Sequence, residues 1–517
     1  MAYGAQPLIR LGQIAAGLVV LLIAGTILAV AWRAEASARL GAADWAAIRF
    51  TLWQAAWSAI LSVALAIPLA RALARRRFPG RSAVVTILGA PFILPVIVAV
   101  LGLLAIFGRN GLLNAGLGAL GLPEVTIYGA WGVVLAHVFF NLPLATRFLL
   151  QAWLSVPSER FRLAASLGFG PAATFRIIEW PLLRATVPGA ALVIFLICTT
   201  SFAVALTLGG GPSATTIELA IYQAFRFDFD LGRAALLALV QLGVTTVAGL
   251  LVLGVAVPDA MGGGLDREVA YRPARGRFLD GLMILLATVF LVTPIGALAV
   301  SGVAALPGLP AEVWWAAMRS IATALGSALL CLVLSLSIAL AVVRARRGVA
   351  RLLDLAGLLG IAASPLVIGT GLFILTFPWI APSRLALPLT GLVNAIMAMP
   401  FALRALIPAV ARVEADYGKL ADNLGLRGGA RLRILILPRL RRPIGFSAGL
   451  AAALSMGDLG VVALFADAGS ATLPLQLYRL MGAYRMEAAS GAALLLLGLS
   501  LCIFWVFDRG GRVDADA

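Results

Sequence analysis

The residues whose types and spacing are most informative lie in two short basic segments, 257 positions apart. The first runs from Leu163 to Gly168 and is followed by Trp180-Pro181; the second runs from Leu420 to Gly425 and is followed by Leu437-Pro438. In each segment, aliphatic residues and basic residues recur at helical spacing, which is typical of a helix that lies along a surface. This duplication predicts two docking sites for two copies of one partner, so we expect the segments to transmit force rather than to catalyse a reaction.

Glycine and proline punctuate both segments at the same spacing. Gly168 and Gly425 can leave a helix in a left-handed turn at low steric cost. Each glycine is followed by a second polar segment. Pro181 and Pro438 are expected to end that segment before the chain re-enters the membrane, because proline removes a backbone donor.

The chain has one lysine, Lys419, and no nucleotide-binding motif surrounds it. A P-loop has the pattern G-x-x-x-x-G-K-[ST], in which the lysine reaches the β- and γ-phosphates and the hydroxyl binds magnesium. Val413 stands where the first glycine belongs, and Leu420 stands where the hydroxyl belongs. We therefore expect that the chain is not an enzyme, and that any ATP hydrolysis occurs on a separate subunit.

The elements that must position these segments are membrane spans. The chain is 62% hydrophobic and only 12% charged, which is more apolar surface than a soluble core of its length could bury. A spanning helix needs about 20 mostly apolar residues, and backbone groups in lipid must be paired within the helix. We predict an all-α polytopic membrane protein with twelve spans, at 11–32, 53–74, 83–107, 127–150, 186–208, 232–256, 278–303, 319–343, 352–376, 385–410, 443–466 and 488–507.

The net charge of +17 is distributed in a way that argues against a nucleic-acid partner. Basic residues gather in alternate loops, which is the positive-inside bias of membrane proteins. With an even number of spans, this bias places both termini and both basic segments in the cytoplasm. The first apolar stretch exceeds the roughly 7–15 residues of a signal-peptide core, so we expect it to be retained as the first span.

The whole chain reads as two parallel repeats. Hairpins that precede the basic segments also correspond, with Ser58 matching Ser327 and Arg75 matching Arg344. Because both basic segments lie on one side of the membrane, the repeats are related by an axis along the membrane normal, and a substrate path would lie near that axis. We predict a first half at 1–256, a polar cytoplasmic linker at 257–277 and a second half at 278–517.

The spacing of glycine, an aliphatic residue and proline in the two segments resembles the EAA loop of ABC importer permeases. In that family the loop is a coupling helix that docks into a groove of the ATP-hydrolysing subunit. The resemblance implies coupling loops at about 158–184 and 411–442, and two copies of an ABC ATPase subunit as partners. Arg162 and Lys419 stand where the family has glutamate, so a contact made by that glutamate does not carry over. The expected coupling residues are Arg162, Leu163, Ala164, Leu167, Gly168, Ile178 and Pro181 in the first half, and Lys419, Leu420, Ala421, Leu424, Gly425, Leu435 and Pro438 in the second.

Within that family, residues 201–223 and the sequence Ile178-Glu179-Trp180-Pro181 resemble the thiamine branch. This resemblance implies a bacterial inner-membrane permease for thiamine or its phosphate esters, served by a periplasmic substrate-binding protein. Ferric-iron permeases share the duplicated architecture and are the alternative. An ion-coupled secondary transporter is a third reading, but it would be expected to have paired intramembrane carboxylates.

Polar residues inside the predicted spans could line the path. An ionised carboxylate there costs about 2.5–3.5 kcal/mol on insertion scales, so Asp458 is expected to face either the path or a hydrogen-bonding neighbour. Ser201 and Phe202 are further candidates for the path.

His137 has no other metal-binding residue type nearby in sequence, so we predict a hydrogen bond between helices and no metal or cofactor site. The three cysteines occur singly and are expected in the core. An external aromatic and acidic patch is predicted from Glu218, Tyr222, Phe225, Phe227, Asp228 and Asp230.

Overall fold

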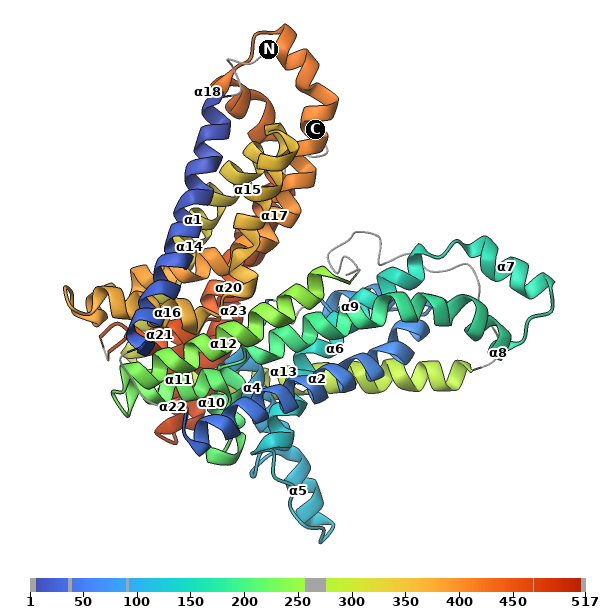
Figure 1. Cartoon of the computed structure of the whole chain (residues 1–517). Coiled ribbons are helices and arrows are strands. Elements are labelled where there is room, and N and C mark those ends of the chain that lie inside the picture. Colours follow the sequence, from blue (N-terminus) through green and yellow to red (C-terminus); the bar gives the residue numbers. More distant parts are fainter. Residues whose placement is uncertain (1–5, 36–39, 90–92, 256–275, 468, 513–517) are drawn as a thin grey trace.

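The computed structural model describes residues 6–35, 40–89, 93–255, 276–467 and 469–512, and within these ranges every regular element is helical (Figure 1). The predicted linker, 257–277, lies outside the described residues except for its last two positions. Elements of the first predicted half are α1 (Gln6–Glu35), α2 (Ala42–Arg75), α3 (Arg81–Ile87), α4 (Val96–Phe107), α5 (Leu112–Ala119), α6 (Ala130–Ser155), α7 (Ser158–Ser166), α8 (Pro171–Thr174), the π-helical turn η2 (Phe175–Glu179), α9 (Trp180–Thr199), α10 (Ala203–Leu208), the 3₁₀ turn η3 (Pro212–Ala214), α11 (Ile217–Arg226) and α12 (Leu231–Leu253).

Elements of the second predicted half follow in nearly the same order. They are α13 (Arg277–Ala305), the 3₁₀ turn η4 (Leu306–Gly308), α14 (Ala311–Arg344), α15 (Arg347–Ala362), α16 (Pro365–Thr376), α17 (Pro382–Asn423), α18 (Gly428–Arg431), the π-helical turn η5 (Leu432–Ile436), α19 (Leu437–Arg439), α20 (Arg441–Met456), α21 (Gly460–Phe465), α22 (Leu473–Gly482) and α23 (Met486–Arg512).

The predicted all-α, multi-pass membrane class is confirmed. In the described part of the chain, 10 helices are long and apolar enough to cross a membrane, or up to 11 with α15 and α16, which meet at 88°. Large apolar side chains such as Leu329 and Val300 are exposed on the outer faces of these helices. A soluble protein rarely exposes so much apolar surface, whereas lipid covers it here.

The predicted spans 83–107 and 352–376 are each divided into two helices, α3 with α4 and α15 with α16, so they are not single helices. The predictions of 186–208 and 443–466 as single helices are wrong as well. The first is interrupted between α9 and α10, and the second between α20 and α21. Thr199 and Thr200 direct their hydroxyls back to the carbonyls of Leu196 and Ile197 at 2.7 and 3.1 Å, a bonding pattern that competes with helix continuation. Apolar sequence continues on both sides of each interruption, so hydropathy alone predicts one long helix in each case.

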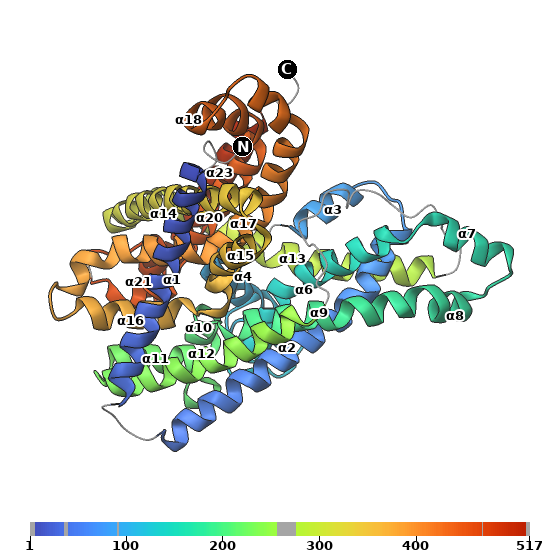
Figure 2. The same ribbon diagram turned by 45° about the horizontal axis from the view of Figure 1, so that its top comes forward.

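The helices form two arms that diverge from a common base (Figures 1 and 2). One arm contains α2, α6 and α9 and ends at α7 and α8; the other contains α14 and α17 and ends at α18. The first helix of each predicted half packs across to the other half: α1 lies against α14, α15 and α16, and α13 lies against α2 and α4. The base therefore holds the two halves together while the arm ends stay apart.

Ion pairs fasten the end of the first arm. Arg75 of α2 and Arg76, which follows the helix, each contact Asp280 of α13 at 2.6 Å. Arg71 contacts Glu179 of η2 at 2.8 Å. Since Asp280 comes from the second predicted half, these contacts also join the halves.

Candidate functional site

The ends of the two arms carry the two basic segments, and we call them the coupling tips after the role proposed for them below. The first tip comprises α7, α8 and η2; the second comprises residues 414–423 of α17 with α18 and η5. Gly168 and Gly425 have φ of +71° and +68°, so the predicted left-handed turns are confirmed. Both turns close in the same way, because the N–H groups of Phe169 and Leu426 donate to the carbonyls of Ala164 and Ala421 at 2.9 Å.

Each tip presents the same pattern of exposed and buried side chains. Leu163 and Leu167 are exposed on the first tip, as are Leu420 and Leu424 on the second, whereas Ala164 and Ala421 are buried. The basic residues beside the leucines, Arg162 and Lys419, are exposed as well. Paired leucines outside the spanning helices, at matching positions of two arms, are suited to docking a partner.

The π-helical turns η2 and η5 occupy matching positions of the two tips, directly before Trp180-Pro181 and Leu437-Pro438. Proline cannot donate the bond to the fourth preceding carbonyl, which favours a locally widened turn. Ile178 and Leu435 lie half-buried within these turns. The prediction that the prolines stop the stretch is wrong: helical structure continues from each π-helical turn into α9 or α19, and each proline lies in the first turn of that next element.

The tips differ at one position that sequence reasoning missed. Pro157 separates α6 from α7, whereas the matching residue, Glu414, lies inside the unbroken α17. The Glu414 carboxylate pairs with Arg344 of α14 and with Arg431 of the second tip. Burial opposes the charged form of Arg431, but its hydrogen bonds to Glu414 and Asp422 prevail and raise its pKa. Comparison of positions 257 apart would have shown this exchange of proline for glutamate.

The two helix interruptions near the base carry polar side chains at matching positions. Ser201 and Asp458 correspond, and so do His137 and Asn394, which lie beside them. The Nε2 atom of His137 lies 2.7 Å from the Ser201 hydroxyl, and its Nδ1 atom lies 3.3 Å from that of Ser58. The predicted hydrogen bonding of His137 between helices is confirmed.

Asp458 is less well satisfied than Ser201. Its Oδ1 atom accepts a long bond, 3.5 Å, from the N–H of Val461, and the N–H groups of Gly460 and Val462 also lie near the carboxylate. Its Oδ2 atom has no hydrogen-bond partner among the described residues. Asn394 faces this carboxylate and donates to the Ser455 hydroxyl at 3.1 Å. An incompletely satisfied carboxylate at a helix interruption has spare capacity to accept from a bound molecule.

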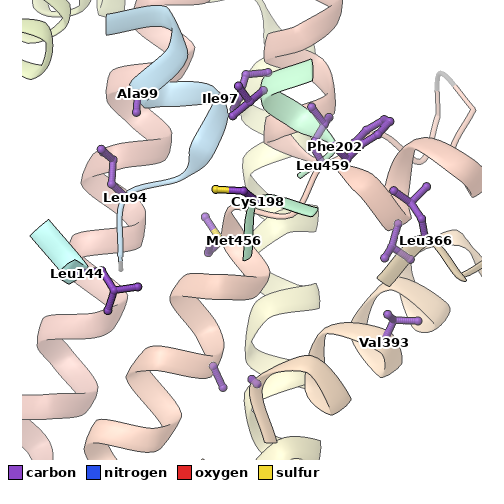
Figure 3. Close-up of a cluster of buried hydrophobic side chains, with 14 of the residues drawn as sticks. Leu94, Ile97, Ala99, Leu144, Cys198, Phe202, Leu366, Val393, Met456 and Leu459 are labelled. Atoms are coloured by element: carbon purple, nitrogen blue, oxygen red, sulfur yellow. The ribbon is translucent and has the colours of Figure 1, made fainter. Parts of the chain in front are cut away.

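Buried apolar side chains from both predicted halves form a cluster in the base (Figure 3). Phe202 and Leu459 are matching residues of the two interruptions, and Ile97 of α4 matches Leu366 of α16. All four side chains are buried. A methyl group added to Gly460 would lie 3.5 Å from Phe202 and 3.6 Å from Leu366, so little space is left between these residues. The rings of Phe225 and Phe373, with centroids 4.1 Å apart, provide a direct contact between the halves. We call the four matching residues the apolar gate.

No family model matches the chain. The thiamine transport system permease protein ThiP of Brucella abortus (strain 2308) is 41% identical to it, over 98% of this chain and 96% of that protein. The ThiP of Escherichia coli (strain K12) is 40% identical over 91% of this chain and 90% of that protein. The chain belongs to the thiamine transport system permease family. The molybdenum transport system permease protein ModB of Azotobacter vinelandii is 31% identical over 34% of this chain and 78% of that protein.

Other expectations for this member of the family are corrected by the structure. The external patch is wrong for Glu218, Tyr222 and Phe225, which are buried because α11 lies between α12 and elements of the second half. Phe227, Asp228 and Asp230 remain at or near the surface. Cys198 and Cys331 are buried as expected, but Cys502 is exposed on α23.

Glu218 is the other residue whose environment the sequence did not reveal. It is fully buried, and neither carboxylate oxygen has a hydrogen-bond partner in the described ranges. Across these same ranges, no group of three histidine, cysteine, aspartate or glutamate residues could hold a metal ion.

Proposed function

We propose that this chain is the transmembrane subunit of an ATP-driven importer that carries thiamine, its phosphate esters or both across the bacterial inner membrane. The similarity to thiamine permeases over nearly the whole chain supports the substrate. The observation that carries the mechanism is the pair of matching coupling tips, each with two exposed leucines beside a left-handed glycine turn.

In this proposal each tip docks one copy of an ABC ATPase, and hydrolysis occurs on those partner chains. The chain itself makes and breaks no covalent bond. The tips and both termini face the cytoplasm, and the base faces the periplasm, where a substrate-binding protein delivers the cargo. The two moving bodies are the halves at 1–256 and 278–517 with their first helices, α1 and α13, exchanged, and the linker at 257–277 joins them.

In this proposal the present arrangement is an inward-facing state, which the separation of the tips and the burial of the four gate residues support. Closure of the two ATPases would push the tips together and rock the arms. Since the arms meet at the base, this motion would separate Phe202 from Leu459 and open the path outward. Separation of the two ATPases from each other after hydrolysis would return the chain to the present arrangement.

Ser201, Phe202 and Asp458 line the path in this account. Thiamine carries a positive charge, so a carboxylate at the interruption between α20 and α21 offsets the cost of moving that charge through a region of low dielectric. Ser201 supplies a neutral hydroxyl at the matching position, so the two halves contact the substrate unequally.

Replacing Asp458 with asparagine is expected to lower the rate of thiamine uptake at low substrate concentration by roughly tenfold, which is about 1.4 kcal/mol of lost interaction. Asparagine keeps the shape and removes the charge. The matched control is Ser201→Ala, which removes a polar group from the equivalent site. We expect it to lower the uptake rate less than threefold, because a neutral hydrogen bond contributes about 0.6 kcal/mol. Equal effects of the two substitutions would argue against a charge-specific role.

The function is tested by reconstitution of the chain with its ATPase in liposomes, with the binding protein added outside and ATP enclosed. We expect ATP-dependent accumulation of labelled thiamine that unlabelled thiamine suppresses and ferric iron does not. Accumulation of ferric iron instead would assign the other substrate, and uptake without ATP would exclude an ATP-driven importer.

A further inference from the structure

Among the described residues, Phe229 and Tyr484 are the only non-glycine residues with positive φ, at +53° and +57°. Bulky residues rarely adopt this left-handed conformation, because the Cβ atom crowds the following carbonyl. Both are aromatic, and each lies two residues before the last helix of its half, α12 or α23. The same unusual conformation therefore recurs at matching turns of the two halves.

The hydrogen bonds of the two turns account for the left-handed backbone conformation, but they do not account for the presence of aromatic side chains there. At Tyr484, the N–H groups of Tyr484 and Arg485 donate to the carbonyls of Met481 and Leu480 at 3.1 and 2.9 Å. This is the Schellman arrangement, in which glycine normally occupies the left-handed position. At Phe229, the N–H of the following residue, Asp230, closes the turn by donating to Ala224 at 2.9 Å. Glycine would make either turn with less steric cost.

Neither ring stabilises the fold by burial. Phe229 is 81% exposed and Tyr484 is 90% exposed. The neighbouring aromatics behave differently: Tyr222 and Phe225 are buried, and Phe227 packs on Tyr222 with ring centroids 5.7 Å apart. Residues that hold a strained backbone conformation and whose side chains stay exposed indicate a function other than stabilising the fold, such as contact with another molecule.

The turn between α11 and α12, which contains Phe229, and the turn between α22 and α23, which contains Tyr484, both lie at the base, away from the coupling tips (Figure 1). Charged groups beside them differ in sign. Asp228, which pairs with Arg233 at 2.7 Å and keeps half of its side chain exposed, precedes Phe229. Arg485, which is exposed, follows Tyr484. A partner with two unlike contact surfaces would complement this arrangement better than a symmetric one.

We propose that Phe229 and Tyr484 are paired aromatic anchors, one for each lobe of the substrate-binding protein. This inference rests on the proposed function, which supplies a two-lobed partner on this side. Exposed aromatic residues supply large contact area at low entropic cost and are enriched among binding hot spots. The lobe that contacts Tyr484 carries acidic residues near its contact, and the lobe that contacts Phe229 carries basic ones.

The test compares the wild-type chain with Phe229→Gly/Tyr484→Gly, each assembled with its ATPase in lipid nanodiscs. The measurement is the concentration of thiamine-loaded binding protein that gives half-maximal stimulation of ATP hydrolysis. We expect this concentration to rise by roughly tenfold or more, as for the loss of two interface anchors. Thermal unfolding should be unchanged or shifted upward, because glycine relieves both strained turns.

Two further variants sharpen the test. Trp32→Ala removes an exposed ring from α1 and should leave the half-maximal concentration at the wild-type value. Arg485→Glu should slow association of the binding protein at low ionic strength, and the difference from the wild-type chain should fade at high salt.

An unchanged half-maximal concentration for the double variant would overturn the inference. An accompanying loss of thermal stability in the nanodiscs would assign the rings to lipid anchoring instead. Failure of the wild-type chain to respond to binding protein would instead contradict the proposed function and remove the basis of the inference.

Discussion

Joint replacement of Gly168 and Gly425 by valine is expected to reduce ATP-dependent thiamine uptake by roughly tenfold or more. A left-handed residue with a Cβ atom costs about 1–2 kcal/mol, and a β-branched residue is especially unsuited to it. No atom lies within 4 Å of a Cβ built on either glycine. The cost of valine is therefore conformational and not steric. We expect it to change the backbone turn at each glycine, and with it the orientation of the exposed leucines relative to the π-helical turn of the same tip.

The matched control is replacement of both glycines by asparagine, which tolerates the left-handed conformation. We expect the asparagine variant to retain most uptake and to copurify with the ATPase, whereas the valine variant loses both. If valine and asparagine had the same effect, the left-handed turns would not be what positions the coupling tips. Circular dichroism and thermal unfolding of both variants establish that the spans remain folded.

Replacement of Phe202 by alanine is expected to have the second large effect, which is to uncouple ATP hydrolysis from the binding protein. Truncation of a buried phenylalanine costs about 3–5 kcal/mol, and Phe202 is buried only while the apolar gate is closed in the mechanism proposed above. A loss of about 3 kcal/mol from one state changes a two-state equilibrium by more than a hundredfold. ATP hydrolysis without binding protein should therefore rise towards the stimulated rate.

Two controls separate this effect from general destabilisation. Phe202→Leu keeps an apolar group in the gate and should raise the unstimulated rate much less. Leu183→Ala removes a buried side chain from the same arm, far from the gate, and should lower thermal stability without raising that rate. A rise with Leu183→Ala equal to that with Phe202→Ala would contradict the assignment of the gate.

Periodicity and composition predicted much of this architecture. Runs of about 20 apolar residues predict spans because a helix is the only lipid-compatible conformation of an open chain. Gly168 and Gly425 were predictable because few other residues fit a left-handed helix end. The hydrogen bonding of His137 was also predictable, since a single polar residue in a span needs a partner from another helix.

The remaining features depend on tertiary arrangement. The interruptions at Ser201 and Asp458 lie in apolar sequence that continues unchanged on either side, so hydropathy alone reads one helix. Glu218 resembles a surface residue until α11 is placed between helices of both halves. Glu414 resembles an ordinary helical glutamate, and its ion pairs appear only once α14 and α17 lie side by side.

The most direct measurement of the central claim is the distance between the two coupling tips during the ATP cycle. Ser166 and Asn423 are exposed, matching positions of the tips, and can carry spin labels as Ser166→Cys and Asn423→Cys. Cys502 is replaced by serine because it is exposed, whereas Cys198 and Cys331 are buried. We predict that pulsed electron paramagnetic resonance shows a shorter distance when the assembled ATPases bind ATP, and recovery of the longer one after hydrolysis. A distance that stays constant through the cycle would contradict the account.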